Sequence, residues 1–160
     1  MANSEKSFGA STNRRSGLSL EPLELFSSGC IILAGDAAHA MTPHQGSGAG
    51  QAVEDACVLA VLLCYKLCNK SNLSLIGKVY DQIRRPVANQ VLAASCISGK
   101  LCGLVAPGFE DVEEGNAHVS FEKLTKLIDD FGKGMEWVWK ESAEDDKRRA
   151  IEMLESLGTG

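Results

Sequence analysis

The stretch Leu33–Ala56, LAGDAAHAMTPHQGSGAGQAVEDA, decides the fold of this chain. It joins a short apolar run at 30–34 to a long apolar segment that is predicted to be helical over about 49–69. Three glycines, each separated by one residue, stand where that helix begins. The first amides of a helix lack partners and carry partial positive charge, and glycines let a ligand approach the backbone. The stretch therefore predicts a loop that holds an anionic or electron-rich group against a helix start.

The rest of the pattern is mainly helical. The run CIILA at 30–34 is expected to form a short buried strand, with a loop over 36–50. Further helices are expected over about 75–101, 120–132 and 135–157, and Pro86 should kink or interrupt the first of these. The helix over 49–69 is apolar nearly all round, so we expect it to be deeply buried. A lone strand needs neighbours, which this chain does not obviously supply.

Composition limits the class of protein. The 160 residues carry 16 basic and 21 acidic side chains, a net charge of −5 without a basic face, which argues against a nucleic-acid partner. No apolar run reaches the ~18 residues that span a bilayer, and the polar N-terminus lacks a secretory signal. The six cysteines form no CxxC pair, so we expect reduced, buried cysteines in a cytoplasmic protein without a metal site.

The domain organisation is expected to be simple. Residues 1–17 are polar and are predicted to be disordered, and residues 18–160 are predicted to form one domain.

The glycine loop is neither a P-loop nor GxGxxG. The full string contains GDAAH at 35–39, Pro43, the glycines at 46–50 and Glu-Asp-Ala at 54–56. This string resembles the second flavin-binding motif of the FAD-dependent aromatic hydroxylases. These are single-component flavoprotein monooxygenases, and PHQGSGAGQAVEDA is most similar to their salicylate-hydroxylase-like branch. The resemblance extends through EPLELFSSGCIILAGDAAH, VYDQIRRPVANQVLAASCISG and MEWVWKESAEDD, and so covers about residues 18–157.

The resemblance implies a role for several loop residues. Asp36 would accept hydrogen bonds from the ribityl hydroxyls of FAD, and Pro43 would lie beside the isoalloxazine. The loop amides would face the pyrimidine edge of the flavin, where a helix N-terminus stabilises negative charge on the reduced form. The expected cofactor-binding residues are Gly35, Asp36, Pro43, Gly46, Ser47, Gly48 and Ala49. Catalytic residues are not assigned, although Pro43 and His44 would border the flavin or substrate.

The resemblance also implies the reaction. NAD(P)H would reduce the flavin, and O2 would be used to hydroxylate a small aromatic substrate.

Neighbouring polar residues have simpler interpretations. His39 is expected to be a packed, hydrogen-bonded structural residue. Arg84 and Arg85 are expected to pair with acids in preference to NADPH phosphate. Glu54 and Asp55 would lie in the first turns of a helix, where acids are favourable.

One part of the family pattern is missing from this sequence. The N-terminal βαβ unit with GxGxxG, which holds the ADP part of FAD, does not occur in it. The expected fold is therefore mainly α, the C-terminal piece of an α/β FAD-binding, Rossmann-like fold. We expect a truncated chain that is inactive in isolation. The alternative is a non-catalytic helical module, or remnant, that docks a complementing chain or self-associates through exposed apolar surface.

Overall fold

The computed structural model describes residues 19, 21–112, 118–140 and 142–158. The expected disorder of residues 1–17 lies outside the described residues. The described part is mainly α, as expected. Its elements are β1 (Ser27–Ser28), β2 (Ile31–Ile32), α1 (Asp36–His39), the 3-10 helix η1 (Pro43–Gln45), α2 (Gly48–Cys64), α3 (Leu73–Cys102), α4 (Phe121–Gly134), α5 (Trp137–Lys140) and α6 (Ala143–Gly158).

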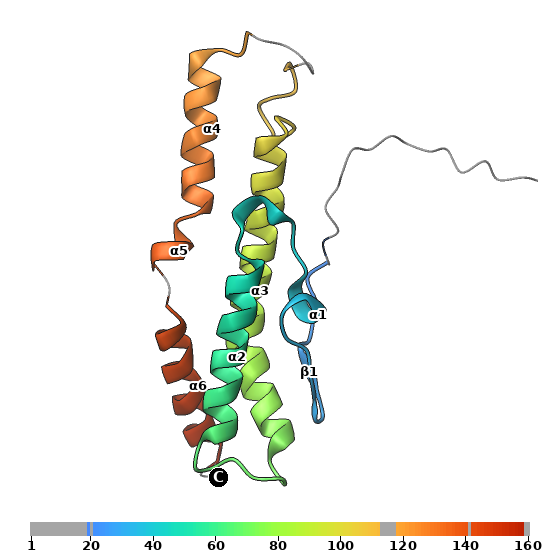
Figure 1. Ribbon diagram of the computed structural model, residues 1–160, viewed down its shortest axis with the longest axis vertical. Coiled ribbons are helices and arrows are strands. Elements are labelled where there is room, and N and C mark those ends of the chain that lie inside the picture. Colours follow the sequence, from blue (N-terminus) through green and yellow to red (C-terminus); the bar gives the residue numbers. More distant parts are fainter. Residues whose placement is uncertain (1–18, 20, 113–117, 141, 159–160) are drawn as a thin grey trace, which may run out of the picture.

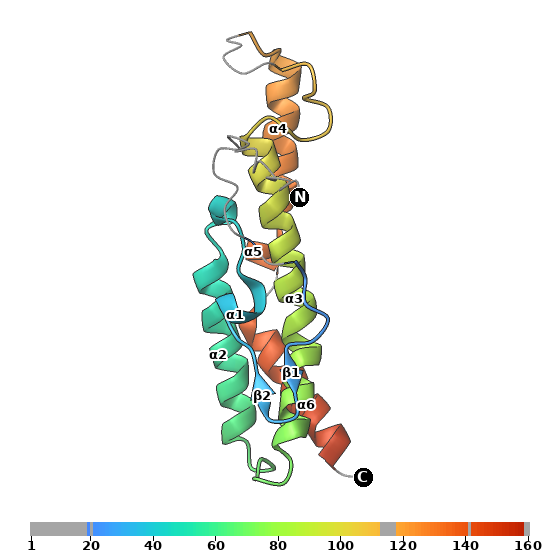
Figure 2. The ribbon, with the colours of Figure 1, turned by 90° about the vertical axis from the view of Figure 1, so that its right-hand side faces the viewer.

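The long helices lie side by side in an elongated arrangement (Figure 1). Helices α2 and α3 run antiparallel, and α6 packs against both of them. Helix α4 packs along the far end of α3, while the hairpin of β1 and β2 lies on α3 beside α1 (Figure 2). The segment 35–50 therefore joins the hairpin to the helical core.

Two groups of apolar side chains hold this arrangement together. The larger lies among α2, α3, α6 and the hairpin, and consists of Phe26, Ala38, Val58, Leu62, Ile76, Val79, Tyr80, Ile83, Ala88, Ala150 and Leu154. The smaller lies where α3 meets α4, and consists of Leu101, Ala106 and Phe109 with Leu104, Val112, Leu127 and Phe131 packed against it. Among the helices that the structure describes, none has the length and apolar character that crossing a membrane requires.

Helix α3 passes through Pro86 without a break, so of the two effects expected of this proline, a kink or an interruption, the interruption does not occur. A proline inside a helix removes one hydrogen bond and costs about 3 kcal/mol. Side chains on both sides of it are buried, from Ile76 and Tyr80 before the proline to Val91 and Leu101 after it. We attribute the continuity of the helix to this packing, which spans the proline.

Other helix boundaries differ in detail from those expected. Ser120 caps α4, close to the expected start of this helix, because its hydroxyl accepts a hydrogen bond from the Lys123 amide at 3.3 Å. The helix continues past Gly132 to Gly134. The single helix expected over 135–157 is instead two, α5 and α6.

The expected buried strand at 30–34 is wrong in length, burial and pairing. The strand β2 has two residues and pairs antiparallel with β1, Ser27 facing Ile32 and Ser28 facing Ile31. Gly29, at φ +60°, allows the tight turn between them. Ile31 is 71% exposed. The partner of this strand is β1, which the chain itself supplies through two polar residues, Ser27 and Ser28.

Helix α2 is buried on one face only, which corrects the prediction that it is deeply buried. Val58 and Leu62 lie in the core, whereas Val53 is 63% exposed and Leu63 is 45% exposed. Nothing in the described part of the chain covers this second face.

The cysteines are also less buried than expected. All six are free, as expected, but Cys30, Cys64 and Cys102 are exposed and the other three are half-buried.

Candidate functional site

The segment from Gly35 to Gly50 contains two short helices, α1 and η1, where a continuous loop was expected. Most of the residues expected to bind the cofactor lie together on its surface. Asp36, Pro43, His44, Gly46 and Ala49 are exposed, Ser47 and Gly48 are half-buried, and Gly35 is buried. We call this segment, residues 35–50, the glycine loop.

Gly35 occupies a position that only glycine fills without strain. It lies at φ 57° and ψ −141°, immediately before α1. A Cβ at this position would come 3.2 Å from the Cβ of Ala52 on α2. The absence of a side chain therefore lets the start of α1 pack closely against α2.

Asp55 fastens both ends of α1 to α2. Its Oδ2 accepts a hydrogen bond from the Gly35 amide at 2.9 Å, and His39 Nε2 lies 2.6 Å from the same oxygen. Burial alone would raise the pKa of Asp55, but the hydrogen bonds from His39, Gly35 and Arg84 outweigh it and hold the pKa below its ordinary value. His39 thus has the packed, hydrogen-bonded role that was predicted for it.

Arg84 on α3 lies at the centre of the same buried cluster. Its Nε donates to Oδ1 of Asp55 at 2.9 Å, and its Nη2 donates to Oε1 of Gln51 at 2.7 Å. Its Nη1 lies 2.6 Å from Oδ2 of Asp146 on α6 and 3.1 Å from Oε2 of Glu54. Burial would lower the pKa of Arg84, but Asp55 and Asp146 reverse this effect and raise it.

The predicted pairing of the two arginines with acids is confirmed. Arg84 pairs with three carboxylates, and Arg85 pairs with Asp81 at 3.1 Å along the same helix. Glu54 and Asp55 lie at about the end of the second turn of α2, which begins at Gly48, so their expected place in the first turns of this helix is confirmed.

Gln51 and Asp146 were missed by the sequence reasoning. Gln51 lies four residues before Asp55, one helical turn away, so the two polar residues share one face of a mostly apolar helix. That spacing was the available signal. Asp146 had none, since it stands in a run of charges at 144–149.

Side chains also fasten the glycine loop to α3. Thr42 Oγ1 lies 2.9 Å from Ser95 Oγ, and Gln45 Nε2 donates to Ser98 Oγ at 3.1 Å. The His44 ring packs over Gly99, where an added Cβ would come 2.6 Å from its Nδ1. The loop is therefore held on its inner side along about one and a half turns of α3.

Gln45 extends this attachment to the C-terminal helices. Its Nε2 also donates to the Gly134 carbonyl at 3.0 Å, and its Oε1 accepts from Trp137 Nε1 at 3.2 Å. The inner side of the loop thus contacts both the end of α4 and the start of α5.

The outer side of the loop carries the groups that were expected to contact an electron-rich ligand. Helix α2 begins there, and the side chain of Ser47 makes no cap hydrogen bond with the described residues. The first amides of α2 therefore remain available to a ligand. Gly46, at φ +64°, has no described atom within 4 Å of its Cβ position. Asp36 supplies an exposed carboxylate for hydroxyl groups.

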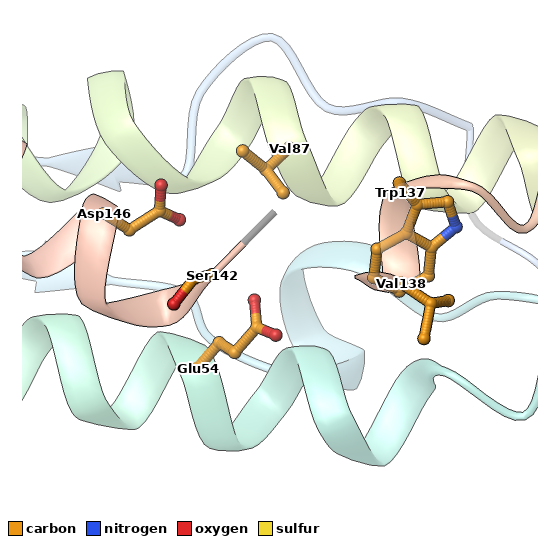
Figure 3. A pocket seen from close by; sticks show the side chains of 6 residues that line it. All are labelled: Glu54, Val87, Trp137, Val138, Ser142 and Asp146. Atoms are coloured by element: carbon orange, nitrogen blue, oxygen red, sulfur yellow. The ribbon is translucent and has the colours of Figure 1, made fainter. Parts of the chain in front are cut away.

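Two clefts of the described structure lie away from the glycine loop. One of about 40 Å³ is lined by Glu54 of α2, Val87 of α3, Trp137 and Val138 of α5, and Ser142 and Asp146 at the start of α6 (Figure 3). Another, of about 430 Å³, runs beside it along Val87, Gln90 and Arg149. The first is too small for an isoalloxazine, and neither is lined by the glycine loop.

Comparison with known proteins agrees with the geometry of the loop. The sequence model of the FAD binding domain family matches residues 14–95, which is about half of the chain and includes the whole glycine loop. The chain belongs to this family. The FAD binding domain match ends within α3, so it takes in Asp55 and Arg84 but not Asp146.

Two salicylate hydroxylases of Pseudomonas putida are similar to this member of the FAD binding domain family. They are 38% and 44% identical to it, each over 122 residues, which cover 76% of this chain and 26% of the relative. A solved structure described as a salicylate hydroxylase substrate complex aligns with a TM-score of 0.68 at 37% identity, covering 81% of this chain and 29% of that one.

The chain spans about a quarter of the length of the curated relatives it matches. A 6-methylsalicylate 1-monooxygenase of Aspergillus terreus is 27% identical over 143 residues, and this chain covers a similar share of its length, 28%.

Among the described residues, no group of three or more His, Cys, Asp or Glu side chains is placed to hold a metal ion.

Proposed function

We propose that this chain contributes the second flavin-binding segment of an FAD-dependent monooxygenase. The observation that carries the proposal is the exposed outer side of the glycine loop, which bears Asp36 and the start of α2 and is hydrogen-bonded from within to α2 and α3. Membership of the FAD binding domain family supports FAD as the group bound there.

Each loop residue has a task in this proposal. Asp36 accepts hydrogen bonds from the ribityl hydroxyls of FAD. The amides of Ser47, Gly48 and Ala49 face the electron-rich edge of the isoalloxazine, where the positive end of the α2 dipole stabilises negative charge. The Gly46 amide donates instead to the Pro43 carbonyl at 3.0 Å and so contributes through the shape of the turn.

Gly35 sets the start of α1, and Pro43 and His44 border the flavin or the substrate. FAD, when bound, supplies the redox chemistry, and the protein contributes orientation and electrostatics.

The reaction proposed is the hydroxylation of a small aromatic compound with O2, with NAD(P)H as reductant. The names of the relatives support this class of substrate, since they act on salicylate or 6-methylsalicylate. We propose that this segment binds and orients the flavin and leaves proton transfer to other parts of the enzyme.

We further propose that the 160-residue chain is inactive in isolation and is completed by another polypeptide segment. The exposed apolar face of α2, with Val53 and Leu63, supports a docking role. This face is also the observation that favours the second candidate function, a helical interaction module without catalysis. The six free cysteines are in keeping with the cytoplasm as the place of action.

A flavin titration tests the proposal. FAD fluorescence is followed as purified chain is added, with the wild type compared with Asp36→Ala and with Asp145→Ala, a matched change at an exposed carboxylate on α6. We expect quenching by the wild type and by Asp145→Ala. Asp36→Ala should bind about tenfold or more weakly, because a hydrogen bond to a charged group contributes ~1.5–3 kcal/mol. Equal binding by all three would overturn the assignment of Asp36, and the interaction-module function predicts binding by none.

A further inference from the structure

The buried cluster around Arg84 connects the glycine loop with α6, two parts of the chain that are distant in sequence. Arg84 donates to Asp55 from one edge of its guanidinium and to Asp146 from another. Arg84 is fully buried, and Asp146 is 5% exposed. Because a guanidinium is planar and its donors have a fixed geometry, the position of one acceptor constrains the position of the other.

Asp55 carries the constraint to α1. One of its carboxylate oxygens faces Arg84, and the other holds the Gly35 amide and His39 Nε2. Gly35 immediately precedes α1, and His39 is the last residue of this helix, whose first residue is Asp36. A rotation of the Asp55 carboxylate would therefore loosen both attachments of α1 at once.

We infer that Asp146 is a positioning residue for the flavin: through Arg84 and Asp55 it fixes where α1 presents Asp36. The inference rests on the proposed function, since it concerns the same loop. It gives α6, which lies outside the FAD binding domain match, a part in flavin binding. Asp146 contacts Nη1 of Arg84, whereas Asp55 contacts Nε, so Asp146 acts through the cluster and not by touching the cofactor.

The alternative is that Asp146 only stabilises the fold. A purely structural role predicts that its removal lowers the free energy of unfolding and leaves the glycine loop of the folded molecules unchanged. A positioning role predicts a local effect at Gly35 and on FAD affinity, beyond any global loss. The two roles are separated by measuring all three quantities on the same variants.

Asp146→Asn is the test variant and Asp145→Asn is its matched control. Both remove one charge from the first turn of α6, so they alter the interaction with the helix dipole alike. Asp145 is 56% exposed and pairs with Arg148, which is 65% exposed, so its loss leaves the buried cluster intact. Asp146→Glu keeps the charge with a longer side chain and serves as a second variant should Asp146→Asn fold poorly.

The first measurement is amide hydrogen exchange by NMR on the full chain without FAD. We expect Asp146→Asn to accelerate exchange at Gly35 about tenfold relative to exchange at Val91 in the α3 core, with Asp145→Asn unchanged. The second is the Kd for FAD, which we expect to rise several-fold in Asp146→Asn, with Asp146→Glu between it and the wild type.

Two outcomes would overturn the inference: unchanged relative exchange at Gly35 in Asp146→Asn, or unchanged FAD affinity in a folded variant. Failure of the proposed function is distinguishable, because a wild type that binds no FAD would refute that function. The exchange measurement would then still decide whether Asp146 holds the loop.

Discussion

Arg84 and Asp55 form a fully buried ion pair, with Nε of the guanidinium 2.9 Å from Oδ1 of the carboxylate. The pair joins α3 to α2 beneath the glycine loop, and the same carboxylate holds Gly35 and His39 on its other oxygen. A buried charge that loses its partner is strongly destabilising, whereas an exposed pair contributes little. The ion pair therefore links the stability of the helical core to the shape of the candidate flavin site.

Replacing Arg84 should be far more costly than replacing its neighbour. Arg84→Met leaves Asp55 buried without its cation, and we expect the free energy of unfolding to fall by about 3–5 kcal/mol. Arg85→Met removes a part-exposed pair with Asp81 and should cost at most about 1 kcal/mol. Urea unfolding followed by circular dichroism measures both, and equal losses would contradict the central place given to Arg84.

The stability of the chain should depend on the protonation of Asp55 at acid pH. The pKa of Asp55 is lower in the folded protein than its ordinary value of 3.8, so folding favours the charged form. Its contribution is fully present above about pH 5 and is lost as the pH falls through the lowered pKa of the folded state.

The difference between the wild type and Asp55→Asn isolates this contribution from those of other carboxylates. We expect the gap in free energy of unfolding to be largest near pH 7 and to shrink as the pH is lowered below 4. A gap that stays constant between pH 7 and pH 3 would show that Asp55 is not held charged by the cluster.

Gly35→Ala should distort the glycine loop, whereas an alanine in α4 should be tolerated. The backbone at Gly35 is strained for other residues, and the added Cβ would meet Ala52, so we expect a loss of about 1–3 kcal/mol. Gly132 is exposed in α4 with no described atom near its Cβ position, and Gly132→Ala should stabilise by about 0.5–1 kcal/mol. Thermal unfolding of both variants checks the pair, and a stable Gly35→Ala would refute the account of this position.

The exposed face of α2 should drive association in the isolated chain. Val53→Lys replaces a 63% exposed apolar side chain with a good helix former and should change monomer stability by about 0.5 kcal/mol or less. Sedimentation velocity over a range of concentrations should show association of the wild type that Val53→Lys reduces. Val58→Lys, on the buried face, is the contrasting variant and should prevent folding. Association that persists unchanged in Val53→Lys would place the contact elsewhere.

The sequence predicted the helical character and the place of the glycine loop, because both follow from local patterns. Spacing of apolar residues located α2 and α3, and Ser120 marked the start of α4. The prediction of a buried strand at 30–34 failed because two serines supply its partner, and the pairing of strands in a hairpin depends on the turn as well as on the pattern of apolar residues.

The buried cluster was only partly predictable for a related reason. The pairing of Arg84 with acids was expected, but the choice of Asp146 depends on how α6 packs against α3. No local pattern distinguishes Asp146 from Asp145 beside it. The continuity of α3 through Pro86 was likewise decided by tertiary packing, which overrides the local cost of a proline.

The most direct test of the account is a titration of the isotopically labelled chain with FAD, followed by amide chemical shifts. The central claim is that the glycine loop is the surface that binds flavin. We predict saturable shifts concentrated at Gly35, Asp36 and the amides of 46–49, and their loss in Asp36→Ala. Shifts confined to the cleft around Val87 and Arg149, or none at the glycine loop at saturating FAD, would contradict the claim.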